Sequence, residues 1–185
     1  MAFYKFFKFF KPCFWWYDGI NSIENLNKLG AMSRSNQRGR FIMTEAFYDR
    51  LAKTRHQIHQ HPEVSEEEHE TTVFLKGYLK NLGIEPLNYP LKTGLIAEIG
   101  SGHPIIALRA DIDALPIKEK TGLPYASDNG AMHACGHDFH QTSLLGAAQL
   151  LKEREAELKG TRSIDFPTSR GKFPRGLSGH RSRRY

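Results

Sequence analysis

The stretch Met132-His-Ala-Cys-Gly-His-Asp138 gathers one thiol, two imidazoles and one carboxylate around a glycine. Cysteine thiolates and neutral histidines are good ligands for zinc and its neighbours in the first transition row. The glycine lets the backbone turn, so that Cys135 and His137 can face the same ion. An alanine-rich apolar run over residues 142–151 follows and is typical of a helix. The stretch therefore predicts a metal site or, alternatively, a buried free cysteine beside polar residues that cap a helix.

The overall composition is that of one soluble globular domain, with 39% hydrophobic and 25% charged residues in a chain of 185. Its formal charge of +6 is unevenly distributed along the chain. Residues 1–42 carry seven basic and two acidic side chains, and residues 162–185 carry seven basic side chains and one acidic one. Residues 43–161 carry 12 basic and 17 acidic side chains. The basic excess at the two ends weakens the case for a nucleic-acid-binding domain. The two cysteines, Cys13 and Cys135, lie far apart, which argues against a disulfide framework and for a cytoplasmic location.

The first 42 residues differ in character from the rest of the chain. Residues 1–17 mix ten aromatic side chains with three lysines, a pattern that could form an interfacial membrane anchor. The lysines interrupt any apolar core of a secretory signal. Residues 21–40 are polar and lack a sustained apolar period. We expect residues 1–42 to be a disordered or non-native extension, and the ordered region to begin at Met43.

Two helices are predicted after Met43. Apolar positions from Phe47 to Ile58 recur at helical spacing, and this helix should end before His61-Pro62 because a proline disfavours helix in the preceding residue. The second helix should begin with a capping box formed by Ser65 and Glu68 and should end at Gly83. Its acidic first turn, formed by Glu66, Glu67, Glu68 and Glu70, is expected to be a solvated face. The expected core face of this helix consists of Val73, Phe74, Tyr78, Leu79 and Leu82.

Two strands and a third helix complete the predicted ordered region. Residues 94–99 and 104–110 have strand character, and the second run is apolar enough to be covered on both faces. It leads into Asp111 and Asp113, where open α/β sheets place their ligands, although a turn that uses aspartates for capping is the alternative. A helix over residues 140–157 should follow the cysteine-histidine stretch. Its predicted core face consists of Leu144, Leu145, Ala148 and Leu151.

Three motifs in a fixed order resemble one family. They are Arg55-His-Gln-Ile-His-Gln-His-Pro-Glu63, Arg109-Ala-Asp-Ile-Asp-Ala-Leu-Pro-Ile117 and the Met132–Asp138 stretch. Residues 43–161 resemble metal-dependent amidohydrolases such as hippurate hydrolase, N-acetyldiaminopimelate deacetylase, indole-acetyl-amino-acid hydrolases and thermostable carboxypeptidases. The resemblance implies an α/β fold, a zinc-exopeptidase-like α/β/α sandwich that a smaller dimerisation domain interrupts in complete members.

The resemblance also implies a chemistry and a set of site residues. The family uses two divalent ions (zinc, manganese, cobalt or nickel) to hydrolyse the amide of an N-acyl amino acid or a C-terminal peptide bond. Cys135 and His137 match metal ligands, with the cysteine bridging the ions. Asp111 and Asp113 match the catalytic acidic pair, one of which orients a histidine ligand or another metal-bound group. In the family, metals acidify a water and a glutamate takes its proton.

His133 and His140 lie beside this site in the sequence. Each could contact a metal-binding side chain without binding the metal itself, or could cap the following helix, and the capping interpretation is favoured.

The chain departs from the family pattern after Thr161. The family continues with a buried strand and two glutamates, whereas residues 162–185 are basic and aperiodic here. We expect a disordered basic tail, as a shifted reading frame would produce, with a nucleic-acid-binding tail as the alternative. The glutamate pair, the later histidines and the dimerisation domain would then be missing.

The sequence therefore predicts an N-terminal part of an amidohydrolase that is inactive and binds metal weakly or not at all. Its expected partners are small N-acyl amino acids or peptides, with no nucleic acid and no membrane. The rival hypothesis is a non-enzymatic membrane- or nucleic-acid-associated protein that acts through its basic ends.

Overall fold

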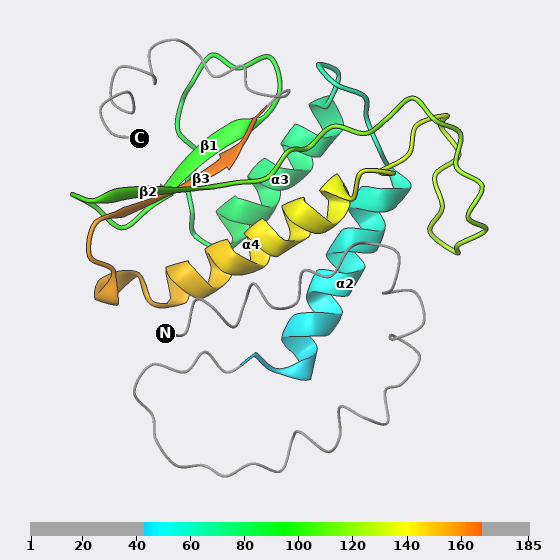
Figure 1. The fold of residues 1–185 in the computed structure, drawn as a ribbon. Coiled ribbons are helices and arrows are strands. Elements are labelled where there is room, and N and C mark those ends of the chain that lie inside the picture. The colour runs from blue at the N-terminus through cyan, green and yellow to red at the C-terminus, as the bar shows by residue number, and fades with distance from the viewer. Residues whose placement is uncertain (1–42, 168–185) are drawn as a thin grey trace. The chain divides into compact units, whose positions relative to one another are not determined.

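The computed structural model describes residues 43–167, which lie within one compact unit (Figure 1). Predictions for residues 1–42 and 168–185 fall outside this range. The elements in order are α2 (Glu45–Gln60), α3 (His69–Asn81), β1 (Leu95–Ile99), β2 (Ile105–Arg109), α4 (His137–Glu153), the 3-10 helix η3 (Glu155–Glu157) and β3 (Thr161–Phe166). No helix within residues 43–167 is both long and apolar enough to cross a bilayer.

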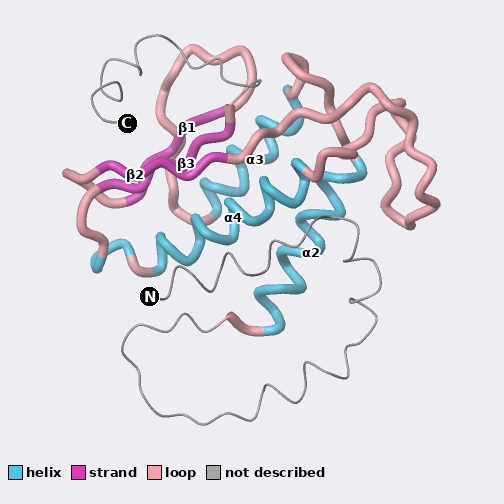
Figure 2. Tube along the Cα trace, in the orientation of Figure 1, coloured by secondary structure: helices cyan, strands magenta, loops and turns pink. Residues whose placement is uncertain are grey.

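The strands form one mixed sheet in the order β1-β3-β2, shown in magenta in Figure 2. The central strand β3 runs antiparallel to β1 and parallel to β2. Parallel neighbours need a long crossover, which α4 supplies between β2 and β3. Helix α4 contacts the sheet, α3 and α2. The α/β fold class is thus confirmed, and the helix-sheet core includes Leu75, Leu79, Ile99, Leu145, Ala148, Ile164 and Phe166.

The predicted boundary at Thr161 is wrong, because residues 162–166 form most of the central strand and not the start of a tail. Ile164 and Phe166 are both 0% exposed. Ile164 pairs with Ala97 on one side and with Leu108 on the other. Both residues are buried because they pack in one core cluster with Leu145 and Ala148 of α4, a tertiary effect that the basic composition of the following residues conceals.

Helix α2 ends where predicted, and Thr44 caps its first turn. The Thr44 hydroxyl accepts a hydrogen bond from the Phe47 amide at 3.2 Å, and the helix ends at Gln60, before His61-Pro62. A threonine at this position satisfies one of the N–H groups that the first turn leaves without a helical partner.

Helix α3 begins differently from the predicted capping box. It starts at His69, and its N-cap residue Glu68 makes no side-chain capping bond. The Glu63 carboxylate instead accepts hydrogen bonds from the Glu70 amide at 3.1 Å and the Thr71 amide at 2.7 Å. A residue from the preceding loop therefore caps the helix, which a local capping rule does not foresee.

Val73 of α3 and the N-cap residue Glu68 differ from the prediction in their burial. Val73 was expected in the core and is 64% exposed. Glu68 was expected in water and is 0% exposed, with Oε2 accepting a hydrogen bond from the Thr93 hydroxyl at 2.7 Å. Burial raises the pKa of Glu68, despite that hydrogen bond. The helix turns Leu75 and Leu79 to the core, and this orientation exposes Val73.

Strand β2 is not covered on both faces within the described residues. Ile105 and Ile106 are each 46% exposed on β2, which is an edge strand of the three-stranded sheet. Helix α4 begins at His137, three residues before the predicted start, and its regular part ends at Glu153. The predicted core face of α4 is otherwise confirmed, with Leu145 0% exposed.

Candidate metal centre

The turn between Cys135 and His137 forms the start of α4. Gly136 is the N-cap and adopts a left-handed conformation with φ of 77°, which residues with a Cβ rarely adopt. Its carbonyl accepts hydrogen bonds from the Phe139 and His140 amides, both at 3.1 Å. Cys135 is a free, exposed thiol, and His137 is 8% exposed. The glycine therefore places the two predicted ligands on either side of one helix terminus.

Asp113 holds the His137 ring. His137 Nδ1 lies 2.7 Å from the Asp113 carbonyl oxygen and 3.0 Å from its carboxylate oxygen Oδ1. An Nδ1–H that donates to Asp113 leaves Nε2 as the nitrogen with a lone pair. Metal-binding histidines commonly have their second ring nitrogen held in this way. The structure thus brings together two of the residues that the sequence singled out.

Asp111 is separated from this contact by its own ion pair. Its Oδ1 accepts hydrogen bonds from Arg109 Nε at 3.0 Å and Nη2 at 2.7 Å. The intervening Ile112 is 0% exposed and belongs to the core. The two predicted acidic residues therefore have different partners, since Asp111 pairs with Arg109 and Asp113 contacts His137.

The two neighbouring histidines do not cap α4, because its N-cap is Gly136 and no side chain bonds to that terminus. His133 is 4% exposed, and neither of its ring nitrogens has a hydrogen-bond partner. Burial lowers its pKa to about 4. His140 is exposed within α4, with its ring centroid 5.8 Å from that of His137. The favoured capping role was wrong for both.

A buried ionic cluster adjoins the turn and was missed by sequence reasoning. His59 Nδ1 lies 2.9 Å from Asp138 Oδ2, and His59 Nε2 lies 3.1 Å from Glu119 Oε1. Arg55 Nε donates to the same Asp138 oxygen at 3.0 Å. The motifs contain Arg55, His59 and Asp138, but no spacing rule connects them with Glu119.

The cluster is held in its charged form. Burial opposes ionisation of Asp138, yet the hydrogen bond from His59 and the charge of Arg55 lower the pKa of Asp138 to about 2. Burial also opposes ionisation of Glu119, yet hydrogen bonds from Thr121, the Ser127 amide and His59 lower its pKa to about 2. The hydrogen bond to Asp138 in turn raises the pKa of His59 against the effect of burial.

The donors at the turn suit a divalent transition metal but do not complete a site. Cys135 offers a soft thiolate and His137 an oriented imidazole, both in keeping with zinc chemistry. Within residues 43–167, no group of three or more histidine, cysteine or acidic side chains is arranged to hold one ion. The described region therefore contributes two donors and one orienting residue, Asp113, whose backbone carbonyl accepts the hydrogen bond from His137.

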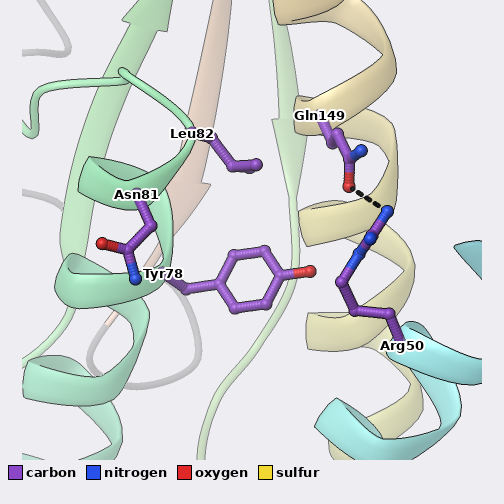
Figure 3. A pocket seen from close by; sticks show the side chains of 5 residues that line it. All are labelled: Arg50, Tyr78, Asn81, Leu82 and Gln149. Atoms are coloured by element: carbon purple, nitrogen blue, oxygen red, sulfur yellow. Dashed lines mark hydrogen bonds between the residues drawn. The ribbon is translucent and has the colours of Figure 1, made fainter.

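A surface pocket of about 300 Å³ lies elsewhere, among α2, α3 and α4. Its lining residues are Arg50, Tyr78, Asn81, Leu82 and Gln149 (Figure 3). Arg50 Nη2 donates to Gln149 Oε1 at 3.4 Å, and Arg50 precedes His59 on α2 by about 13 Å of helix rise. The pocket is thus remote from the turn, whose donor chemistry makes it the stronger candidate site.

Comparison with known proteins confirms the family resemblance. Residues 107–166 match Peptidase family M20/M25/M40. This match covers the end of β2, the turn, α4 and β3, which are the elements that position Asp113, Cys135 and His137. This part of the chain is therefore similar to the M20/M25/M40 peptidases.

Three relatives illustrate the match. An N-acetyl-L-cysteine deacetylase of Bacillus subtilis (strain 168) is 61% identical over 113 residues, which are 60% of this chain and 27% of that protein. The IAA-amino acid hydrolase ILR1-like 5 of Arabidopsis thaliana is 48% identical over 124 residues, 66% of this chain and 28% of that protein. The crystal structure of a Bacillus subtilis dinuclear metal binding peptidase from the M20 family aligns with a TM-score of 0.66 and 52% identity, covering 68% of this chain and 36% of that one. The chain thus spans roughly a third of these proteins.

Proposed function

We propose that the chain carries part of the active site of a metal-dependent amidohydrolase that acts on small N-acyl amino acids or on a C-terminal peptide bond. The observation that carries this proposal is the His137 ring, held by Asp113 at 2.7 and 3.0 Å beside the free thiol of Cys135. Relatives described as an N-acetyl-L-cysteine deacetylase and an IAA-amino acid hydrolase support the substrate class.

Cys135 and His137 would hold a divalent cation (zinc, manganese, cobalt or nickel), and a similar structure described as dinuclear supports a two-ion site. When bound, such ions polarise an amide carbonyl and acidify water. Asp113 accepts the Nδ1–H of His137 and so keeps Nε2 available as a donor. Asp111, paired with Arg109, shapes the end of β2 in this proposal.

Residues 43–167 supply two donors at this turn, fewer than the three or four that zinc sites use. The chain by itself should bind metal weakly and should give no detectable turnover. A cytoplasmic location fits the use of only two, widely separated cysteines. The alternative of a membrane or nucleic-acid role depends on the basic ends, which lie outside the described residues.

A chimera tests the proposal. Residues 43–166 would replace the matching segment of the Bacillus subtilis deacetylase that is 61% identical over 113 residues. We expect hydrolysis of N-acetyl amino acids that requires added divalent metal and is lost in Cys135→Ser and His137→Ala. The matched control is His140→Gln, since His140 is an exposed histidine on the same helix. A folded chimera that is inactive, or one that keeps full activity with Cys135→Ser, would contradict the proposal.

A further inference from the structure

We propose that His59 is a positioning residue for the candidate metal centre, because its imidazole joins Asp138 of α4 to Glu119 of the preceding loop and so fixes the turn that carries Cys135 and His137. The inference rests on the proposed function and extends it to a residue outside the set of donors.

The geometry places His59 between two buried carboxylates. It lies in the last turn of α2 and is 4% exposed, while the side chains of Asp138 and Glu119 are 1% and 0% exposed. Its two ring nitrogens lie 2.9 and 3.1 Å from one oxygen of each carboxylate. An imidazole donates from both nitrogens only when it is protonated. His59 is therefore a cationic bridge between α4 and the loop.

Glu119 connects His59 to the loop that ends at the turn, through further hydrogen bonds. Its carboxylate also accepts hydrogen bonds from the Ser127 amide at 2.7 Å and from the Thr121 hydroxyl. Backbone hydrogen bonds of 3.0 and 2.9 Å between Leu115 and Met132 close the base of the loop. The strand-like end of this loop leads directly into the Cys135 turn, so the anchoring of Glu119 restrains the chain on the N-terminal side of the site.

Asp138 restrains the other side of the turn. It follows His137 in the sequence, and Arg55 from α2 donates to its Oδ2 at 3.0 Å. His137 itself is held by Asp113. The first turn of α4 is thus held from α2 through Asp138 and from the end of β2 through Asp113.

The charged and titratable groups around His59 come from every neighbouring element. Arg55 and His56 lie on α2, Asp138 lies on α4, and Glu119 lies in the loop. Tyr125 contacts the His59 ring edge-on at 5.5 Å, and the ring centroid of His133 lies 6.4 Å away. The two carboxylates outweigh burial, so the bridge stabilises the fold below the unfolded-state pKa of histidine and is lost as the pH rises through the raised folded-state pKa of His59.

Local hydrogen exchange in the full chain tests the inference without metal. In His59→Gln, the Phe139 and His140 amides, which bond to the Gly136 carbonyl, should exchange about tenfold faster relative to the core amide of Ile164. The matched control is His56→Gln, because His56 stacks on Tyr125 from the same helix but has no hydrogen bond to a carboxylate. That control should leave the ratio unchanged.

Cobalt binding supplies the second measurement, in a Cys13→Ser background so that only Cys135 can give a thiolate-to-cobalt absorption band. His59→Gln should weaken Co²⁺ affinity about tenfold, the lower end of the effect of partners behind metal ligands. A folded His59→Gln chain with either the parent's exchange ratio or the parent's Co²⁺ affinity would overturn the inference. If His59→Gln does not fold, Glu119→Gln is tested instead by the exchange ratio and the Co²⁺ affinity, with the same expected results.

The two proposals fail in distinguishable ways. Absence of any Cys135-dependent cobalt band in the parent chain contradicts the proposed function, because the donor pair is then wrongly assigned. An unchanged exchange ratio at Phe139 and His140 contradicts the positioning role of His59, whatever the metal result.

Discussion

Truncation of Phe166 to alanine should strongly destabilise the chain. Phe166 is 0% exposed, lies in the core cluster and pairs with Leu95 at the end of β3. Buried Phe→Ala substitutions typically cost about 3–5 kcal/mol, through lost transfer free energy and the cavity that remains. Domains of this size are stable by only about 5–15 kcal/mol, so Phe166→Ala removes a large share of the free energy of unfolding.

Urea unfolding of the full chain, followed by far-UV circular dichroism, measures this loss. With a urea dependence of about 2 kcal/mol per molar, the midpoint should fall by roughly 2 M. Val73→Ala is the control, because Val73 is 64% exposed on α3 and its truncation should change the free energy by no more than about 0.5 kcal/mol. Equal midpoints for Phe166→Ala and the parent would refute the placement of residues 162–166 in the core.

Two further substitutions address the buried polar groups. The pKa of Asp138 is lowered from 3.8 to about 2 in the folded chain, so its contribution to the free energy of unfolding is present above pH 3.8 and is lost as the pH falls toward 2. Asp138→Asn should abolish this contribution, which is on the order of 2 kcal/mol. If the melting temperature of Asp138→Asn depends on pH between 2 and 7 as steeply as that of the parent, the prediction is wrong. Thr93→Val removes the hydrogen bond to buried Glu68 and should cost about 1–3 kcal/mol, whereas Thr93→Ser should preserve most of the stability in the same urea titration.

Local sequence signals predicted those parts of the fold that depend on neighbours in the chain. The end of α2 follows from His61-Pro62 directly after it, and the core face of α4 follows from helical spacing. The cap of α3 failed as a prediction because Glu63, six residues before the helix start, supplies the acceptor. The position of Ile164 in a strand was not predicted because its strand partners, Ala97 and Leu108, are both more than 50 residues away in the sequence.

The site was predictable only in part for the same reason. The spacing of Cys135 and His137 around a glycine carries its own chemical signal, and Asp113 lies in a motif that points to the same centre. The structure pairs Asp111 with Arg109, two residues away, and a role for Asp111 beside Asp113 stays a prediction. His59 and Glu119 meet across 60 residues of sequence, so only the folded chain shows that they form one cluster with Asp138.

Cobalt titration of the Cys13→Ser chain tests the central claim most directly, namely that Cys135 and His137 form the metal-binding part of an M20-type site. The account predicts weak binding, with a thiolate-to-cobalt absorption band that disappears in Cys135→Ser and weakens strongly in His137→Ala. Tight, stoichiometric binding that neither substitution changes would contradict the account, because the ligands would then lie elsewhere in the chain.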